Sequence, residues 1–160
     1  MKKKFFPAVL LFSVIAFLSS CGGHSAEYAN EVIVEKADKV IELMDKAFDY
    51  IDDDEYDNAQ AYLDSVINHV TTSEPIIAAL NNKSAEKLQQ ATLEYLTLFK
   101  AGVADYKQAI EIYKTAEDDE QMEKANDLIN NFIEKADAKL SEMQELQIAF
   151  AKENNIILED

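Results

Sequence analysis

The chain has 160 residues, a formal net charge of −16, one Cys, three Gly and no Trp, and all 15 of its basic residues are Lys. This length suggests one modest domain. The scarcity of Gly excludes turn-rich β folds and Gly-rich phosphate loops, which need backbone at positive φ. Nucleic-acid binding is excluded because it depends on clustered Lys and Arg, and a single Cys excludes an internal disulfide.

Residues 1–20 have the pattern of an export signal. Lys2–Lys4 form a basic start, an apolar stretch follows, and small residues close the segment. The segment Leu18-Ser19-Ser20-Cys21 resembles the lipobox of bacterial lipoproteins, in which an aliphatic residue stands three places before a Cys and two small residues lie between them. This resemblance implies cleavage after Ser20, an S-diacylglycerol group on Cys21 and N-acylation of the new terminus, palmitate being an expected acyl group.

The alternative for this segment is a transmembrane anchor. The apolar run 5–18 contains Pro7 and is shorter than the ~20 residues that cross a bilayer. We therefore expect a lipid-anchored protein of the cell envelope, at the outer membrane or cell surface rather than at the inner membrane. Removal of residues 1–20 takes away three Lys and no acid, so the mature chain carries 12 Lys, 31 acids and a net charge of −19.

After a short tether, 21–25, apolar residues recur at steps of three and four along residues 26–158, the pattern of amphipathic helices. The pattern predicts four long helices, at 26–53, 55–73, 84–115 and 117–154. The predicted core stripes are Ile33, Ala37, Val40, Met44, Ala47 and Ile51; Tyr56, Ala59, Leu63, Val66 and Val70; Leu88, Thr92, Tyr95, Phe99, Gly102, Tyr106, Ala109 and Tyr113; and Met122, Ala125, Ile129, Phe132, Ala136, Leu140, Met143 and Phe150.

Capping residues and a proline suggest where the helices begin and end. The predicted N-caps of the four helices are, in chain order, Ser25, Asp54, Ser84 and Thr115. Pro75 disfavours helical backbone at the residue before it, so the second helix is predicted to end near Ser73. A short helical turn through Leu80 would follow it.

The connections between the first two helices and between the last two are short, which favours antiparallel neighbours. The sequence therefore predicts an all-α fold, an antiparallel up-down-up-down four-helix bundle. Both short connections would lie at one end of this bundle. The lipidated N-terminus, the 74–83 connection and the C-terminus would lie at the other.

The end that carries the two short connections, here called the acidic tip, would gather nine acids. Their mutual repulsion would be relieved by a divalent cation or a basic protein partner, although acids also favour helix N-termini and are often simply solvated. A Ca²⁺-loop pattern starting at Asp53 fails, because Asn58 stands where such loops need Gly. The candidate contact residues are Asp52, Asp53, Asp54, Glu55, Asp57, Glu117, Asp118, Asp119 and Glu120.

The opposite end of the predicted bundle is apolar. Its side chains would either close the core or contact a membrane or a partner, and core closure is the more common use of such residues. They are Ile76, Ile77, Leu80, Ile156, Ile157 and Leu158.

Patterns for catalysis are missing from the sequence. Neither His24 nor His69 belongs to the Glu-x-x-His pair of a di-iron bundle, and no haem, zinc-protease, hydrolase or P-loop motif occurs. The sequence thus predicts no enzyme, cofactor or metal site. Tyr95, Tyr106 and Tyr113 share one helix face, where they would either line an apolar cavity or form ordinary core.

The body of the chain resembles an uncharacterised family of small, all-helical bacterial surface lipoproteins. The resemblance lies in the opening segment 28–33 (YANEVI), the break at Pro75 and the closing segment 150–155 (FAKENN). It implies no activity. We therefore expect a non-enzymatic interaction or structural module, held to the membrane through Cys21 and meeting a protein partner at the acidic tip. The alternative is a protein that binds a small ligand or a divalent cation in the bundle interior or at the acidic tip.

Overall fold

The computed structural model describes residues 24–158, and the regular elements in this range are helical, so the predicted all-α class is confirmed. The signal segment 1–20 and Cys21 lie outside the described residues. The elements are α1 (Ala26–Asp52), α2 (Tyr56–Ala78), the short 3-10 helix η1 (Lys83–Ala85), α3 (Glu86–Thr115) and α4 (Asp119–Asn154).

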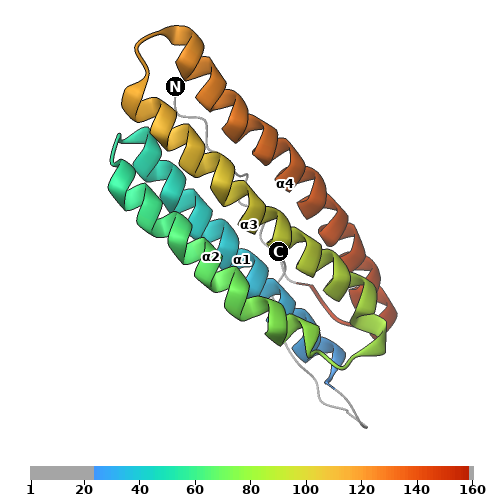
Figure 1. The fold of residues 1–160 in the computed structure, drawn as a ribbon. Coiled ribbons are helices and arrows are strands. Elements are labelled where there is room, and N and C mark those ends of the chain that lie inside the picture. The colour runs from blue at the N-terminus through green and yellow to red at the C-terminus, as the bar shows by residue number, and fades with distance from the viewer. Residues whose placement is uncertain (1–23, 159–160) are drawn as a thin grey trace.

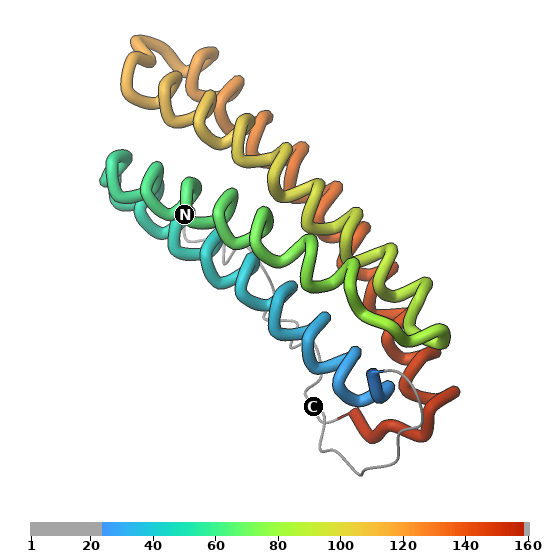
Figure 2. The backbone as a smooth tube through the Cα atoms, turned by 60° about the horizontal axis from the view of Figure 1, so that its bottom comes forward, coloured from blue at the N-terminus to red at the C-terminus, as the bar shows by residue number. Residues whose placement is uncertain are grey.

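The four long helices lie side by side along most of their lengths (Figure 1). Backbone contacts are most extensive between α1 and α2, between α2 and α3, and between α3 and α4, and α1 also contacts α3. The 53–55 and 116–118 connections lie toward the same end in both Figure 1 and Figure 2, whereas α1 begins and α4 finishes at the opposite end. Within residues 24–158, no helix combines the length and the apolar character that a bilayer-spanning helix needs.

The predicted apolar stripes form the core, with three exceptions. Leu63, Phe99 and their counterparts on the other helices are buried, as the helical period predicts. Tyr56 and Tyr113 are only half-buried, and Met122 keeps 41% of its surface exposed. All three exceptions lie near the acidic tip, so the core ends before the helices do.

Aromatic rings fill the middle of the interior. The ring centroids of Tyr95 and Phe99 lie 4.7 Å apart, and the edge-on contacts of Phe132 with Phe99 and Tyr106 have centroid distances of 5.2 and 5.5 Å. Burial raises the pKa of both tyrosines well above its ordinary value, so their phenols are neutral. Tyr95 and Tyr106 are thus core residues.

The predicted end of the second helix at Ser73 is wrong, because α2 continues through Pro75 to Ala78. Proline lacks the N–H that would bond to the preceding turn, which weakens the helix locally. Continuation buries Ile77 completely, and the Gln89 side-chain amide donates a 2.7 Å hydrogen bond to the Ile77 carbonyl. Burial of an Ile side chain contributes about 1.5–3 kcal/mol, enough to offset one missing backbone hydrogen bond.

Two predicted caps lie in the first half of the chain. Ser25 caps α1 as predicted, because its hydroxyl accepts a 3.1 Å hydrogen bond from the Tyr28 backbone N–H. Asp54 was predicted to cap the second helix, but Glu55 occupies that position and makes no side-chain cap bond. Asp54 instead adopts a left-handed conformation with φ 59°, which suits the tight turn between α1 and α2.

The other two predicted caps are also wrong. Asn82, rather than Ser84, accepts hydrogen bonds from the backbone N–H groups of η1, and this turn leads into α3. Asp118, rather than Thr115, caps α4 by accepting a 2.9 Å hydrogen bond from the Gln121 backbone N–H. Thr115 is the last residue of α3 and directs its hydroxyl back to a carbonyl of that helix.

Candidate functional site

A length difference between the two helix pairs leaves an opening at the acidic tip. α1 and α2 have 27 and 23 residues, whereas α3 and α4 have 30 and 36. Figures 1 and 2 both show the α3–α4 connection extending beyond the α1–α2 connection. The last turn of α3 and the first turns of α4 therefore continue their apolar stripes beyond the helices that would cover them.

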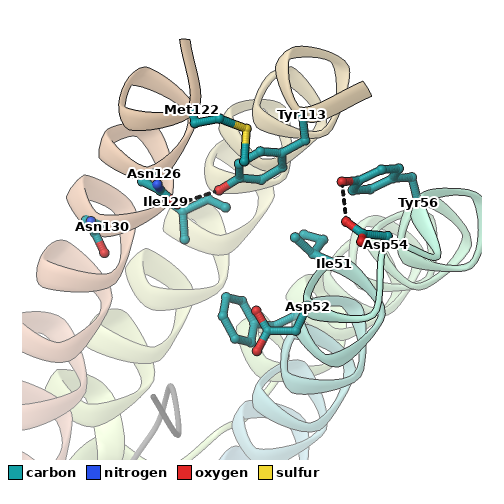
Figure 3. A pocket seen from close by; sticks show the side chains of 10 residues that line it. Ile51, Asp52, Asp54, Tyr56, Tyr113, Met122, Asn126, Ile129 and Asn130 are labelled. Atoms are coloured by element: carbon teal, nitrogen blue, oxygen red, sulfur yellow. Dashed lines mark hydrogen bonds between the residues drawn. The ribbon is translucent and has the colours of Figure 1, made fainter. Parts of the chain in front are cut away.

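A cleft of about 480 Å³ lies at this opening, between the α1–α2 turn and the projecting ends of α3 and α4 (Figure 3). We call it the tip cleft. Its volume falls in the range of small-molecule sites, roughly 300–1,000 Å³. The lining residues are Phe48, Ile51, Asp52, Asp54, Tyr56, Tyr113, Met122, Asn126, Ile129 and Asn130.

Two tyrosines face each other across the tip cleft from different helix pairs. The rings of Tyr56 and Tyr113 are nearly parallel, at 16°, with centroids 6.4 Å apart. The Tyr56 hydroxyl donates a 2.7 Å hydrogen bond to Asp54 Oδ1, and the Tyr113 hydroxyl donates a 2.8 Å bond to Asn126 Oδ1. These bonds fix the orientation of both rings, as Figure 3 shows.

The lining of the tip cleft is electronegative. Among the described residues, it includes the carboxylates of Asp52 and Asp54 and no Lys. Burial, followed by the hydrogen bond to Asp54, raises the pKa of Tyr56 to about 12. Burial and the Asp52 charge raise the pKa of Tyr113 above its ordinary value. Both phenols therefore remain protonated at neutral pH, and among the described lining residues the carboxylates of Asp52 and Asp54 are the ionisable acids that remain.

The nine predicted acids of the acidic tip are all exposed, but they have different roles. Asp52 and Asp54 line the tip cleft, and Asp118 caps α4. Asp57 forms a 3.6 Å ion pair with Lys114 of α3. The remaining five are Asp53, Glu55, Glu117, Asp119 and Glu120.

No group of three metal-binding side chains comes together within residues 24–158. The described part of the acidic tip therefore offers no ready-made cage for a hard divalent cation, which needs six or more oxygen ligands. The two histidines have structural contacts instead. His69 Nε2 lies 2.9 Å from the Lys36 carbonyl oxygen, a contact that joins α2 to α1, and 3.2 Å from Ser73 Oγ on its own helix.

The start of the described chain is fastened at the end opposite the acidic tip. The His24 backbone N–H donates to the Asn81 carbonyl, and the Asn81 N–H donates to His24 Nδ1, both at 3.1 Å. The Asn82 side chain donates a 3.0 Å bond to the His24 carbonyl. The chain therefore enters the helical body beside the connection between α2 and α3.

The predicted apolar end is divided between core and surface. Ile77 and Leu80 are buried, whereas Ile76 and Ile157 have exposed fractions of 44% and 75%. Ile156 and Leu158 are half-buried. Part of this set closes the core and part remains on the surface.

Sequence reasoning found the acids of the tip cleft but not its walls. Tyr56, Tyr113 and Met122 were assigned to core stripes, and Phe48, Asn126 and Asn130 were not singled out. The available signal was the difference in predicted helix length, because the third and fourth helices extend their stripes further than the first two can cover. Comparison of the chain with protein-family models, curated proteins and solved structures gives no match.

Proposed function

We propose that this chain is a lipid-anchored envelope protein of bacteria, built as an antiparallel up-down-up-down four-helix bundle and acting as a non-enzymatic interaction module through its acidic tip. The protein would be located at the outer membrane or the cell surface. Support for the anchor comes from the lipobox-like segment that ends at Cys21.

The observation that carries this proposal is that the start of the described chain and the acidic turns lie at opposite ends of the molecule. His24 is bound to the α2–α3 connection at one end, and the acidic turns lie at the other. Three peptide units separate Cys21 from His24, a reach of about 10 Å. A membrane anchor at Cys21 would therefore hold the first end near the lipid surface and direct the acidic tip away from it.

The anchor is tested by Cys21→Ala in cells fed labelled palmitate. We expect the variant to lose the label and to move from the detergent-rich to the aqueous phase on detergent phase separation. Ser25→Ala is the matched control, because it changes a cap of α1 outside the lipobox and should keep the label. Label that persists in the Cys21→Ala protein would overturn the anchor. Protease added to intact cells then separates an external acidic tip from a periplasmic one.

The partner of the acidic tip is proposed to be a protein with a basic surface. Complementary charge steers such an encounter and makes its rate depend on salt. Charge reversal at Asp53 and Asp119, which do not line the tip cleft, should reduce the amount of partner that is captured by crosslinking to the anchored protein. The Glu31→Lys and Glu153→Lys pair, at the opposite end, provides the control. Equal capture by both variants would contradict a role for the acidic tip.

A second candidate function is binding of a small ligand, and the tip cleft favours it. Its size, its two fixed aromatic rings and its few convergent polar groups are typical of ligand sites. The bundle interior is a weaker candidate, because Tyr95, Phe99 and Phe132 pack against one another there. A divalent-cation site at the acidic tip is also weaker, since no three ligating side chains converge within residues 24–158.

A further inference from the structure

We propose that the tip cleft binds a small organic cation, an ammonium group carried on an apolar body. This inference rests on the second candidate function, ligand binding in the tip cleft, and it adds the chemical class of the ligand. It does not depend on the lipid anchor.

The apolar body would lie against exposed Met122, above a floor of buried core residues. Ile51 and Ile129 form the floor between the two helix pairs, where they keep only 7% and 3% of their surface exposed. Met122 projects into the cleft from α4 with 41% of its surface exposed. A ligand that covers this surface removes apolar area from water, which contributes roughly 25 cal/mol per Å².

The positive charge follows from the walls. Asp52 at the end of α1 and Asp54 in the following turn line the cleft, and the Tyr56 and Tyr113 rings present aromatic surface beside them. A cation is attracted both by carboxylates and by the faces of aromatic rings. The same walls would repel an anion, and an uncharged ligand would desolvate the carboxylates without pairing them.

The nearby Lys does not neutralise this site. Lys114 lies on α3 next to Tyr113 but outside the lining, and it is paired with Asp57 at 3.6 Å and with Glu111 at 3.5 Å. The lining amides of Asn126 and Asn130 carry no charge. Among the described residues, the lining of the cleft therefore contains carboxylates and no cationic side chain.

An organic cation fits better than a metal ion. A hard cation binds water strongly and replaces it only for several well-placed oxygens, and no three ligating side chains converge within the described residues. An ammonium group needs fewer contacts, because one carboxylate and an aromatic face can accommodate it. A cleft of about 480 Å³ also has room for the apolar body that such a cation carries.

The test uses the full chain in detergent with its methionine methyl groups labelled for NMR, and phenethylammonium as the probe. Met122 reports on the tip cleft, whereas Met44 and Met143, at 1% and 0% exposed, report on the core. The uncharged control is 2-phenylethanol, which has the same ring and chain length. We expect a saturable shift of the Met122 signal with phenethylammonium and at least about tenfold weaker binding of the alcohol.

Three variants locate the cation. Asp52→Asn should weaken binding of phenethylammonium about tenfold, because it removes one negative charge and keeps the size of the side chain. Asp53→Asn removes the same charge from the same turn, but this side chain does not line the cleft, so its effect should stay below about twofold. Tyr113→Leu should weaken binding several-fold through loss of the aromatic wall. Unchanged Met44 and Met143 signals verify that each variant is folded.

The possible failures are distinguishable. Equal binding of phenethylammonium and 2-phenylethanol would overturn the cation class and leave a ligand-binding cleft. Absence of any Met122 shift with either probe would overturn both the class and the second candidate function. Equal weakening by Asp52→Asn and Asp53→Asn would show general charge attraction and overturn the assigned site. None of these outcomes affects the palmitate test of the anchor.

Discussion

Gly102 and Phe132 are packed so closely that a Cβ atom placed on Gly102 would lie 2.2 Å from both Cδ2 and Cε2 of the Phe132 ring. Gly102 lies in the middle of α3, and Phe132 lies on the facing surface of α4. The ring is also held by edge-on contacts with Phe99 and Tyr106, so it has little freedom to move away. The missing side chain at Gly102 thus permits the close approach of α3 and α4.

Gly102→Ala should therefore destabilise the protein by about 2 kcal/mol in urea unfolding. Overpacking of a core costs about 1–3 kcal/mol, and the 2.2 Å approach to the Phe132 ring puts this change at the upper end. About 2 kcal/mol then remains after the ~1 kcal/mol that Ala gains over Gly in a helix. Ala101→Gly, at the exposed neighbouring position, measures the helix preference alone. Phe132→Leu combined with Gly102→Ala should cost less than the two single changes together. A more stable Gly102→Ala protein would contradict the packing.

Asp38 makes stability depend on pH. Partial burial raises its pKa to about 6, so the folded protein holds this proton more tightly than the unfolded chain does. Its contribution to stability is therefore greatest below about pH 4 and falls as the pH rises through about 6. Asp38→Asn should stabilise the protein at pH 7 by about 1 kcal/mol, a figure reduced for solvent screening of a half-buried group.

Urea unfolding at pH 7 and pH 4 measures this effect of Asp38→Asn, and the gain should disappear at the lower pH. Glu31→Gln removes one negative charge from an exposed position of α1 and corrects for the general acidity of the chain. A gain of equal size for both variants at pH 7 would show that net charge, rather than burial of Asp38, is responsible.

Asp118→Ala should reduce the free energy of unfolding by about 1 kcal/mol, because its carboxylate caps α4 at the Gln121 N–H. Thr115→Ala should cost less than about 0.5 kcal/mol, since the Thr115 hydroxyl only returns to its own helix. Asp119→Ala removes a first-turn charge without removing the cap and provides the control. If Thr115→Ala proved the more damaging change, the assignment of Asp118 as N-cap would be wrong.

Ile77 and Ile76 test the continuation of α2 through Pro75. Ile77→Ala should cost about 2–4 kcal/mol, because the helix places this side chain fully inside the core. Ile76→Ala removes the same atoms from a position that is 44% exposed and should cost less than about 1 kcal/mol. Similar costs in thermal or urea unfolding would indicate that the helix ends before these residues.

The local errors of the sequence prediction share one cause. Pro75 and Thr115 were judged on what each residue favours by itself, namely a break and a cap. In the fold, burial of Ile77 outweighs the preference of Pro75, and Asp118 is better placed to cap α4. Local preferences amount to about 1 kcal/mol for a cap and a few kcal/mol for proline, so tertiary contacts of similar size can reverse them.

The tip cleft also depends on tertiary contacts that the sequence does not reveal directly. Asp52 and Asp54 could be selected from the sequence as part of an acidic tip, because acids next to helix ends are visible in one dimension. Tyr113 and Met122 occupy stripe positions identical in kind to those of buried residues, so the greater predicted length of the third and fourth helices was the one sequence signal that they would be left uncovered. Only the offset of the two helix pairs separates them from the core.

Amino-acid order alone was enough to predict the all-α class, four long helices and most of the core of this protein, because the helical period is a property of neighbouring residues. The close approach at Gly102, the partial burial of Asp38 and the opening beside Tyr113 were decided by the packing of helices against one another. Helix lengths and offsets set which part of each apolar stripe is covered. That coverage depends on residues far apart in the chain, and so it is established only when the helices come together.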